Sequence, residues 1–385
     1  MLEYNENILL LHNIIMGAGQ GKVVHVPMFS MRSYETNKYD LTCDGNMNRL
    51  VSVWINVIKT YLRGPKTEKL DIRVIIPSLD DLTPQSVDFL KKIEDEAGGY
   101  LTFMYEFGYP SGGPKVIRSL NGTLALNHNL GKFLQKLEGK KVVVYEPEYV
   151  GTFVEGLKKS FNEYDYRSMT TVFWCPVSDT ESTKPSFLEN VRYVDRELAN
   201  ACDCLMVATS NQVKYFSSYN TRNLVILMDM LIDPSLPIFS FKEDKEMKDS
   251  IDKYEADGKH VIYFPFRLSD PGYRFKDVLK CLEDINSLYP IVLLYTDPND
   301  TAKDLIPKGS NLELVKVSSN RDTYYTCISD KRCIIPYFED VADIMHASWQ
   351  EMEFYKSSVV SWDLVGGLRD EKHMHQLLVD AIENS

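Results

Sequence analysis

The sequence has 385 residues, of which 43 are Lys or Arg and 55 are Asp or Glu, so its formal net charge is −12. Apolar residues at 44% and charged residues at 25% are ordinary for a folded protein, and this length predicts two or three domains. The composition excludes wholesale disorder. The acidic balance argues against a protein that coats nucleic acid through its overall charge.

Neither a membrane span nor an export signal is expected. No apolar run reaches the roughly 18 residues that a spanning helix needs, and the first seven residues contain two Glu and no Lys or Arg. The seven cysteines are odd in number and irregularly spaced, which is typical of a reducing compartment. We therefore expect a cytoplasmic protein without integral membrane association.

The first part of the chain alternates β-rich runs with amphipathic segments. Strands are expected at 22–29, 71–77, 101–107, 140–145, 170–175 and 203–209. Helices are expected at 48–62, 83–96 and 189–202. This alternation predicts an α/β fold with mostly parallel sheets.

A charged stretch then interrupts the pattern. Residues 224–259 hold Pro234 and Pro237, followed by a run rich in Lys, Asp and Glu, and we interpret them as a crossing between domains. Beyond it, strands are expected at 260–264, 291–296, 312–317, 333–336 and 359–362. Helices are expected at 275–288, 342–355 and 370–383.

The sequence therefore predicts two Rossmann-like domains facing a cleft. The expected boundaries are 1–223 for the first domain, 224–259 for the crossing and 260–385 for the second domain. The last helix is a candidate to pack back on the first domain. Because ligands bind beyond the carboxyl ends of strands in open parallel sheets, we look for the site in the loops there.

Three tempting motifs have simpler interpretations. The stretch GAGQGK at 17–22 lacks the Ser or Thr that follows the Lys of a phosphate loop, and a strand comes next where that motif needs a helix. The cysteine pairs 202/204 and 327/333 do not have zinc-finger spacing, and buried thiols are the better interpretation. His373 and His375 are spaced wrongly for one helix face. We expect no bound metal.

Cations gather after the strand at 260–264. Arg267 comes just past the strand end, and Arg274 and Lys276 open the next helix. A helix N-terminus offers N–H donors and Arg offers a bidentate fork, so this group suits a diphosphate. Solvated loop charges are an equal alternative.

Two acidic residues mark the helix expected at 342–355. Asp343 and Glu351 are eight residues apart, which puts them on nearly one face. A carboxylate beside a nucleotide pocket can accept both ribose hydroxyls. The alternative is a surface carboxylate on an amphipathic helix.

Together these segments resemble the donor-binding half of two-domain, GT-B type glycosyltransferases. That family has a strand followed by Arg and a second cation, and later an acidic residue, seven intervening residues and a Glu, followed by a strand and a Gly-rich turn. The sequence matches with Arg267 and Arg274, then Asp343-x7-Glu351, and then Val359-Val360 and Gly366-Gly367. The resemblance covers the last 125 residues or so in register.

The resemblance implies a hexosyl- or pentosyltransferase. Arg267, Arg274 and Lys276 would bind the diphosphate of a nucleotide-sugar co-substrate, most simply a UDP-sugar, with no further cofactor. Glu351 and Asp343 would bind the donor ribose or sugar.

The acceptor would then belong to the first domain. Asp179 and Glu181 follow the strand at 170–175, where an inverting enzyme could place its general base. A turn or helix cap at Asp179 is equally compatible with the sequence, and Asp44 is a weaker candidate for the base.

The spacing of Arg267, Arg274 and Glu351 is also similar to phage enzymes that glycosylate hydroxymethylated pyrimidines in double-stranded DNA. Such a viral enzyme would work in the host cytoplasm and would need a basic rim. Candidates for that rim are Lys132, Lys136, Lys140, Lys141, Lys158, Lys159 and Arg167. A cell-surface glycan or a small molecule is the alternative acceptor. A non-catalytic nucleotide-sugar-binding protein and a nucleotide-sugar epimerase are alternative functions.

Overall fold

The structure is a computed structural model of the 385-residue chain. It describes residues 22–27, 38–41, 71–76, 78–99, 101–105, 140–145, 170–175, 204–207, 213, 217, 224–227, 232, 234, 239–266, 268–269, 273–298, 300–338, 347–362 and 371–384. Within these residues, every helix is too short or too polar to cross a membrane.

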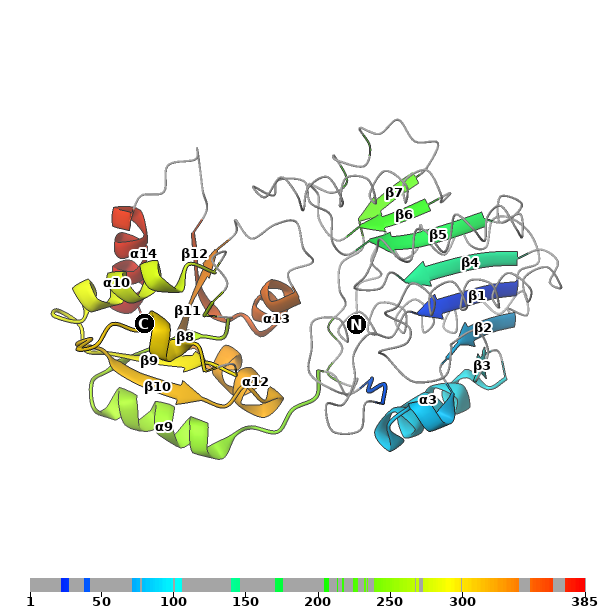
Figure 1. The fold of residues 1–385 in the computed structure, drawn as a ribbon, viewed down its shortest axis with the longest axis horizontal. Helices are drawn as coiled ribbons and strands as arrows, with labels where there is room; N and C mark the ends of the chain where they lie inside the picture. The colour runs from blue at the N-terminus through cyan, green and yellow to red at the C-terminus, as the bar shows by residue number, and fades with distance from the viewer. Residues whose placement is uncertain are drawn as a thin grey trace. The chain divides into compact units, whose positions relative to one another are not determined.

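The chain divides into two compact units, and the first comprises Met1–Phe239 and Ala342–Ala347. Its parallel seven-stranded sheet has the order β3-β2-β1-β4-β5-β6-β7 (Figure 1). The strands are β1 (Lys22–Pro27), β2 (Asp71–Ile75), β3 (Leu101–Met104), β4 (Lys140–Tyr145), β5 (Thr170–Cys175), β6 (Cys204–Val207) and β7 (Leu224–Leu227). Runs of β-branched residues such as VVHV and KKVVVY explain why these segments are strands.

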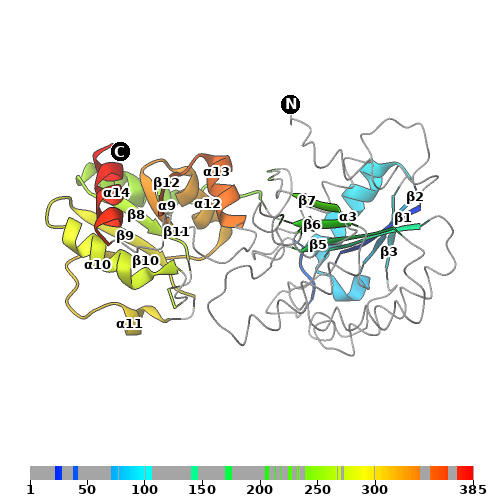
Figure 2. The same ribbon diagram turned by 90° about the horizontal axis from the view of Figure 1, so that it is seen from above.

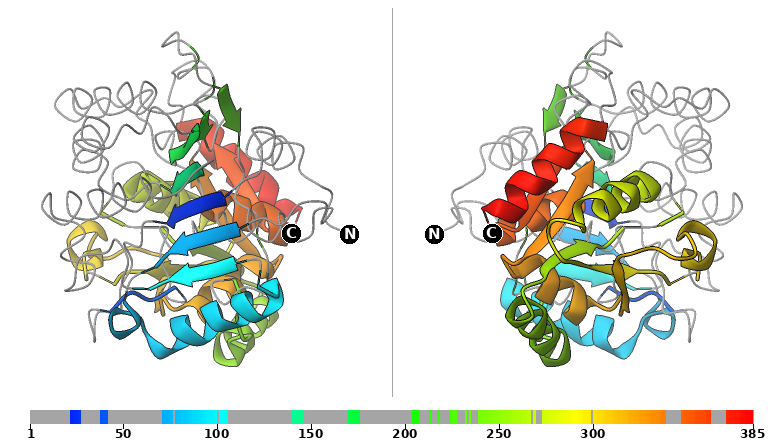
Figure 3. Two further views of the ribbon diagram at one scale, coloured as in Figure 1. Left: turned by 90° about the vertical axis from the view of Figure 1, so that its right-hand side faces the viewer. Right: turned by 90° about the vertical axis from the view of Figure 1, so that its left-hand side faces the viewer.

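Helix α3 (Pro84–Ala97) packs beside β3 in this unit (Figure 3). Thr83 begins the helix by accepting a hydrogen bond from the Ser86 amide, with Pro84 in the first turn. Gly98 ends it with a φ of 56°, a conformation that favours glycine. The buried side chains Phe89, Leu90, Ile93 and Ala97 recur every three or four residues, so one face of the helix covers the sheet.

The second unit comprises Ser240–Val341 and Ser348–Ser385, and its parallel five-stranded sheet has the order β10-β9-β8-β11-β12 (Figure 1). The strands are β8 (His260–Phe264), β9 (Ile291–Thr296), β10 (Glu313–Val317), β11 (Cys333–Phe338) and β12 (Ser358–Trp362). The helices are α9 (Lys245–Ala256), α10 (Phe275–Ile285), α11 (Ala302–Leu305), α12 (Arg321–Ser329), α13 (Ala347–Tyr355) and α14 (Glu371–Glu383). All six residues of β9 are buried, as expected for a central strand covered on both faces.

Helices cover both faces of this second sheet (Figure 1). Helix α9 contacts β8 and α12, whereas α14 contacts α10, β11 and β12. The last helix thus packs on the sheet of its own unit. Its packing against the first domain stays a prediction. Right-handed crossovers account for the arrangement, because connections that run in opposite directions across a parallel sheet fall on opposite faces.

The division between the units differs from the expected crossing at 224–259. Residues Leu224–Leu227 form β7 and pair with β6, so they belong to the first sheet. Residues 245–256 form α9, which packs on β8. The boundary therefore falls between Phe239 and Ser240. The charge-rich sequence reflects a helix that buries only Met247 and Ile251.

The strand order of each sheet reverses at one point. In the first unit the chain moves from β1 outward through β2 and β3, and then returns to place β4 on the other side of β1. In the second unit it moves from β8 through β9 and β10, and then returns to place β11 beside β8. Ligands of open α/β sheets bind at such reversals, beyond the carboxyl ends of the strands.

Candidate functional site

In the second unit, the strand order reverses between β8 and β11, so the connections after these two strands are the expected ligand-binding loops. Arg274 and Lys276 stand at the end of the first connection, and Glu351 lies on α13 after the second. Arg267 and Asp343 belong to the same two connections but lie outside the described residues. The topology thus places the described residues Arg274, Lys276 and Glu351 on two helices that begin at one edge of the sheet.

Arg274 is the residue immediately before α10, and its backbone is left-handed with a φ of 49°. Its guanidinium binds the Asp277 carboxylate through Nε and Nη2, both at 2.6 Å from Oδ2. Lys276 is exposed in the first turn of the same helix. The positive end of the helix dipole and these two cations together make this helix start suitable for an anion.

Glu351 is fully buried between α12 and α13, which lie side by side in Figures 1 and 2. Its Oε1 accepts a hydrogen bond of 2.7 Å from the Tyr325 hydroxyl, and its Oε2 accepts one of 2.9 Å from the Tyr324 hydroxyl. Burial raises the pKa of nearby Tyr355, and the negative charge of Glu351 raises it further. The carboxylate is therefore held by defined donors, unlike the surface carboxylate that was the alternative from sequence.

Sequence reasoning missed the two tyrosines, because helix α12 was not expected. The signal was present: Asn320 is a favourable N-cap residue, and its side chain accepts a hydrogen bond from the Thr323 amide at 2.8 Å. The pairing of α12 with a residue 26 or 27 positions away could not be read from the sequence.

Aromatic rings join the two connections. Phe266 stacks on Tyr273 with ring centroids 4.7 Å apart, and it also contacts Tyr337 at the end of β11. Tyr337 in turn contacts Trp349 on α13 at 4.8 Å. These ring contacts therefore pack the β8–α10 connection, β11 and α13 against one another.

The loop after β9 holds the Asp297-Pro-Asn-Asp300 segment, which is poorly spaced for a metal-binding DxD motif. Asp297 accepts hydrogen bonds from the amides of Thr301 and Ala302 and from the Thr301 hydroxyl. Burial alone would raise the pKa of Asp297, but these hydrogen bonds outweigh burial and lower it. Asp300 forms an ion pair with Lys316. Both carboxylates therefore have partners within or next to this loop. Among the described residues, no cluster of potential metal ligands occurs.

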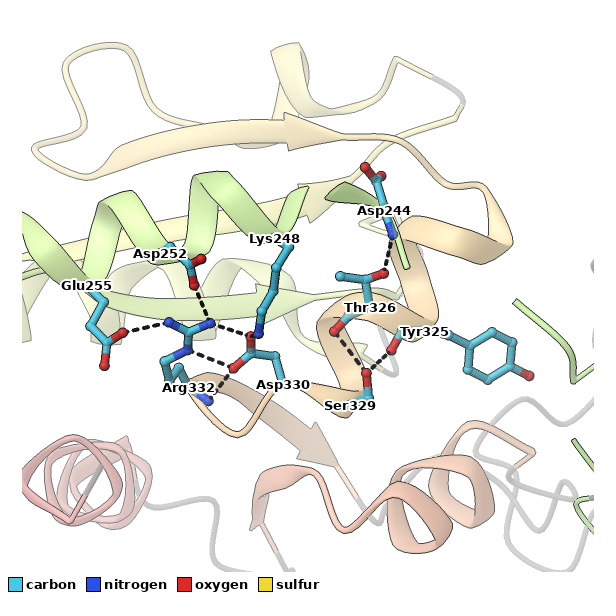
Figure 4. A network of polar contacts seen from close by, with 9 residues as sticks. All are labelled: Asp244, Lys248, Asp252, Glu255, Tyr325, Thr326, Ser329, Asp330 and Arg332. Atoms are coloured by element: carbon cyan, nitrogen blue, oxygen red, sulfur yellow. Dashed lines mark hydrogen bonds and ion pairs between the residues drawn. The ribbon is translucent and has the colours of Figure 1, made fainter. Parts of the chain in front are cut away.

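A polar network fastens α9 to the turn between α12 and β11 (Figure 4). Arg332 binds Asp330 at 2.7 and 2.9 Å and also pairs with Asp252 and Glu255 on α9. Lys248 on α9 donates a hydrogen bond of 2.6 Å to Oδ2 of Asp330, an oxygen that Arg332 also binds. Burial alone would raise the pKa of Asp330, but the hydrogen bonds from Arg332 and Lys248 hold it well below its usual value.

The candidates for the general base, Asp179 and Glu181 together with the weaker candidate Asp44, lie outside the described residues. Asp179 and Glu181 follow β5, which pairs with β4 at the reversal of the first sheet. Lys140 and Lys141 begin β4, so they lie at the amino edge of that sheet, opposite the edge where acceptor loops start. These two lysines therefore do not fit the basic rim, whose other members lie outside the described residues.

The cysteines and histidines behave as the simpler interpretations predict, wherever they are described. Cys327 and Cys333 are buried free thiols, and a hydrogen bond between them, with burial, raises the pKa of Cys333. His373 and His375 lie on α14.

Comparison with solved structures identifies the fold. No protein-family model matches the chain, and no curated protein matches its sequence. The sucrose-phosphate synthase of Thermosynechococcus elongatus matches with a TM-score of 0.57 at 10% identity, over 94% of this chain and 90% of that chain. The trehalose-phosphate synthase of E. coli, bound with UDP-2-fluoro glucose, matches with a TM-score of 0.52 at 11% identity, over 94% of this chain and 92% of that chain. These proteins are GT-B glycosyltransferases, and the chain has the GT-B type fold.

Proposed function

We propose that the protein is a glycosyltransferase that moves a sugar from a nucleotide-diphosphate donor to an acceptor hydroxyl. The observation that carries the proposal is a GT-B type fold in which Arg274 and Lys276 begin the helix after β8, beside the strand-order reversal. A parallel sheet binds ligands there, and cations at a helix N-terminus suit a diphosphate. The solved relative with bound UDP-2-fluoro glucose favours a UDP-sugar as the donor.

In this proposal, Arg267, Arg274 and Lys276 bind the donor diphosphate. Negative charge builds on that diphosphate as the glycosidic bond breaks, while the sugar takes on oxocarbenium character. Fixed cations stabilise this charge more in the transition state than in the ground state, which is how they accelerate the reaction. Asp277 orients the Arg274 guanidinium through two of its nitrogens.

Glu351 and Asp343 bind the ribose or the sugar of the donor. A carboxylate can accept hydrogen bonds from two neighbouring hydroxyls at once, which suits the 2′ and 3′ hydroxyls of ribose. Asp179 or Glu181, after β5, acts as the base that takes the proton from the acceptor hydroxyl if the enzyme inverts configuration.

In this proposal, the acceptor binds at the loops of the first sheet, and two classes of acceptor are candidates. A hydroxymethylated pyrimidine in double-stranded DNA is one candidate, and a glycan or a small molecule is the other. The position of Lys140 and Lys141 at the amino edge removes two cations from the DNA-binding rim, so the second candidate is now favoured. Transfer of labelled sugar to hydroxymethylated duplex but not to plain duplex would restore the first.

A thermal-shift screen with UDP and a panel of nucleotide sugars tests the proposal. We expect at least one to raise the melting temperature, and we expect Arg267→Ala and Arg274→Ala to abolish that increase. Lys280→Ala is the matched control, because it removes the same kind of charge from α10 one turn further from its N-terminus.

Three outcomes separate the alternatives. No shift with any nucleotide or nucleotide sugar would refute the proposal. Binding without release of nucleotide diphosphate in the presence of acceptors would indicate a non-catalytic binding protein. A changed sugar without any acceptor would indicate an epimerase.

A further inference from the structure

Arg274, at the start of α10, holds a backbone conformation that residues with a side chain rarely adopt. Its φ is 49°, in the left-handed region where a Cβ atom makes the conformation costly and glycine is favoured. Such strain persists only where neighbouring contacts impose it, and it gathers at functional sites. An arginine rather than a glycine at this position therefore indicates a use for the side chain.

The two chain neighbours of Arg274 are both fastened to aromatic rings. Before it, Tyr273 stacks on Phe266 with ring centroids 4.7 Å apart and an interplanar angle of 12°. After it, Phe275 packs on Phe264 of β8 with centroids 5.1 Å apart. Phe264 and Phe266 contact each other at 5.3 Å, so both fastenings belong to one group of rings at the end of β8.

This group of rings is part of the core of the second unit. Phe264, Phe266 and Phe275 are at most 5% exposed, and Phe266 also contacts Tyr337 of β11 at 5.9 Å. Buried rings packed on several sides keep one rotamer, so they fix the chain on both sides of Arg274. Packing thus imposes the left-handed turn at this residue.

The helix start beside this turn offers donors to an anion. Arg274 occupies the cap position of α10 but makes no side-chain hydrogen bond to the amides of the first turn. Lys276 is exposed in that turn, and the Arg274 side chain stays 14% exposed while it binds Asp277. The place of the guanidinium relative to these donors depends on the backbone turn from which its side chain extends.

We propose that Tyr273 and Phe266 are positioning residues for the donor diphosphate: their stack imposes the turn that sets where the Arg274 guanidinium lies. The two rings directly precede Arg274 and Arg267 in the sequence, so the stack also holds together the residues to which both arginines are bonded. A cation placed before the ligand arrives loses less conformational freedom on binding. The inference rests on the proposed function, because it assigns these arginines to the diphosphate.

The test needs a readout that a loss of stability alone would not change. The probes are UDP and UMP, which differ by the β-phosphate, and their dissociation constants are measured by titration calorimetry with the full chain. Tyr273→Leu removes the stacking ring but keeps an apolar side chain. If the stack only stabilised the second unit, this variant would weaken the binding of both nucleotides by the same factor.

For the wild type we expect UDP to bind about thirtyfold more tightly than UMP, the equivalent of one charge-assisted hydrogen bond. In Tyr273→Leu this preference should fall to about fivefold or less. Adding Tyr273→Leu to Arg274→Ala should cause no further fall, because the ring acts through that guanidinium. Tyr289→Leu is the matched control: it removes a ring that contacts His260 beyond the other end of α10, so the preference should stay as in the wild type.

The outcomes separate the inference from the function on which it rests. If the wild type binds neither nucleotide, or binds both equally, the proposed diphosphate site fails and the inference fails with it. If the wild type prefers UDP and Tyr273→Leu keeps the full preference, or lowers it as much in Arg274→Ala, the proposed function stands and the inference is wrong. Should Tyr273→Leu unfold, Phe266→Leu makes the same test from the other ring, and an unchanged preference there would also overturn the proposal.

Discussion

Replacing Arg332 by methionine should destabilise the second unit. The methionine keeps much of the aliphatic stem but removes the guanidinium that joins Asp330 to Asp252 and Glu255 on α9. Asp330 is only 5% exposed, so losing its main partner leaves a buried carboxylate with Lys248 and the backbone amide of residue 332 as its donors. Removing one member of a buried ion pair costs more than the pair contributes, because the other charge remains buried.

The size of the loss follows from the exposure of each contact. The two side-chain hydrogen bonds to buried Asp330 should account for about 2 to 3 kcal/mol. The pairs with Asp252 and Glu255, whose side chains are 54% and 61% exposed, should add at most about 0.5 kcal/mol each. We therefore expect the free energy of the unfolding that exposes the amides of the second unit to fall by about 3 kcal/mol. This fall corresponds to amide hydrogen exchange that is about a hundredfold faster.

Hydrogen exchange of the β8 and β11 amides at pH 7 measures this loss within the intact chain. Glu255→Gln is the control, because it removes only an exposed partner and should change the opening free energy by about 0.5 kcal/mol or less. The native pKa of Asp330 lies below its unfolded value, so its contribution is present above the unfolded pKa and is lost as pH falls. The difference between wild type and variant should thus shrink below about pH 4. A loss under 1 kcal/mol at pH 7, or an equal loss in Glu255→Gln, would refute the reasoning.

Two further predictions concern other parts of the chain. Thr83→Ala should lower the free energy of unfolding by about 1 kcal/mol, because it removes the N-cap hydrogen bond that the Ser86 amide of α3 donates to the Thr83 side chain. Urea unfolding of the wild type, Thr83→Ala and Thr83→Ser measures the loss, and Thr83→Ser is the control because it keeps the capping oxygen. Equal losses in the two variants would contradict the cap. Cys327 and Cys333 should resist alkylation at pH 8 in the folded chain, because both are buried and the pKa of Cys333 is raised. Mass spectrometry after iodoacetamide treatment checks this, and rapid labelling of either thiol without denaturant would contradict it.

Much of the fold can be predicted from the sequence, because its central strands carry strong local signals. The segments at 260–264 and 291–296 are short apolar runs rich in β-branched and aromatic residues, and they form β8 and β9 with these bounds. The strands expected at 140–145 and 170–175 are likewise confirmed as β4 and β5.

The missed elements have weak or opposing signals. Helix α9 has a charged surface and buries only Met247 and Ile251, so its composition resembles that of a linker. Helix α12 buries Thr323 and Thr326 together with the consecutive apolar pair Cys327 and Ile328 and with Tyr325, and this mixture lacks the regular apolar spacing of an amphipathic helix. In both cases tertiary contacts stabilise a helix that local pattern alone does not predict.

The candidate site is less accessible to sequence reasoning than the fold. The positions of Arg274 and Lys276 can be predicted from the sequence, because they stand where the helix that follows β8 begins. The burial of Glu351 and its two tyrosine partners depend on how α12 packs against α13, and no local pattern encodes that contact. The binding and catalytic roles remain predictions for every proposed site residue, namely Asp179, Glu181, Arg267, Arg274, Lys276, Asp343 and Glu351.

The most direct measurement of the central claim is hydrogen exchange of the full chain with and without UDP. If the nucleotide diphosphate binds where the second sheet reverses its strand order, protection should appear in peptides covering the β8–α10 and β11–α13 connections, and Arg274→Ala should remove it. Protection confined to the first unit, or binding of UDP that leaves both connections unprotected, would contradict the claim.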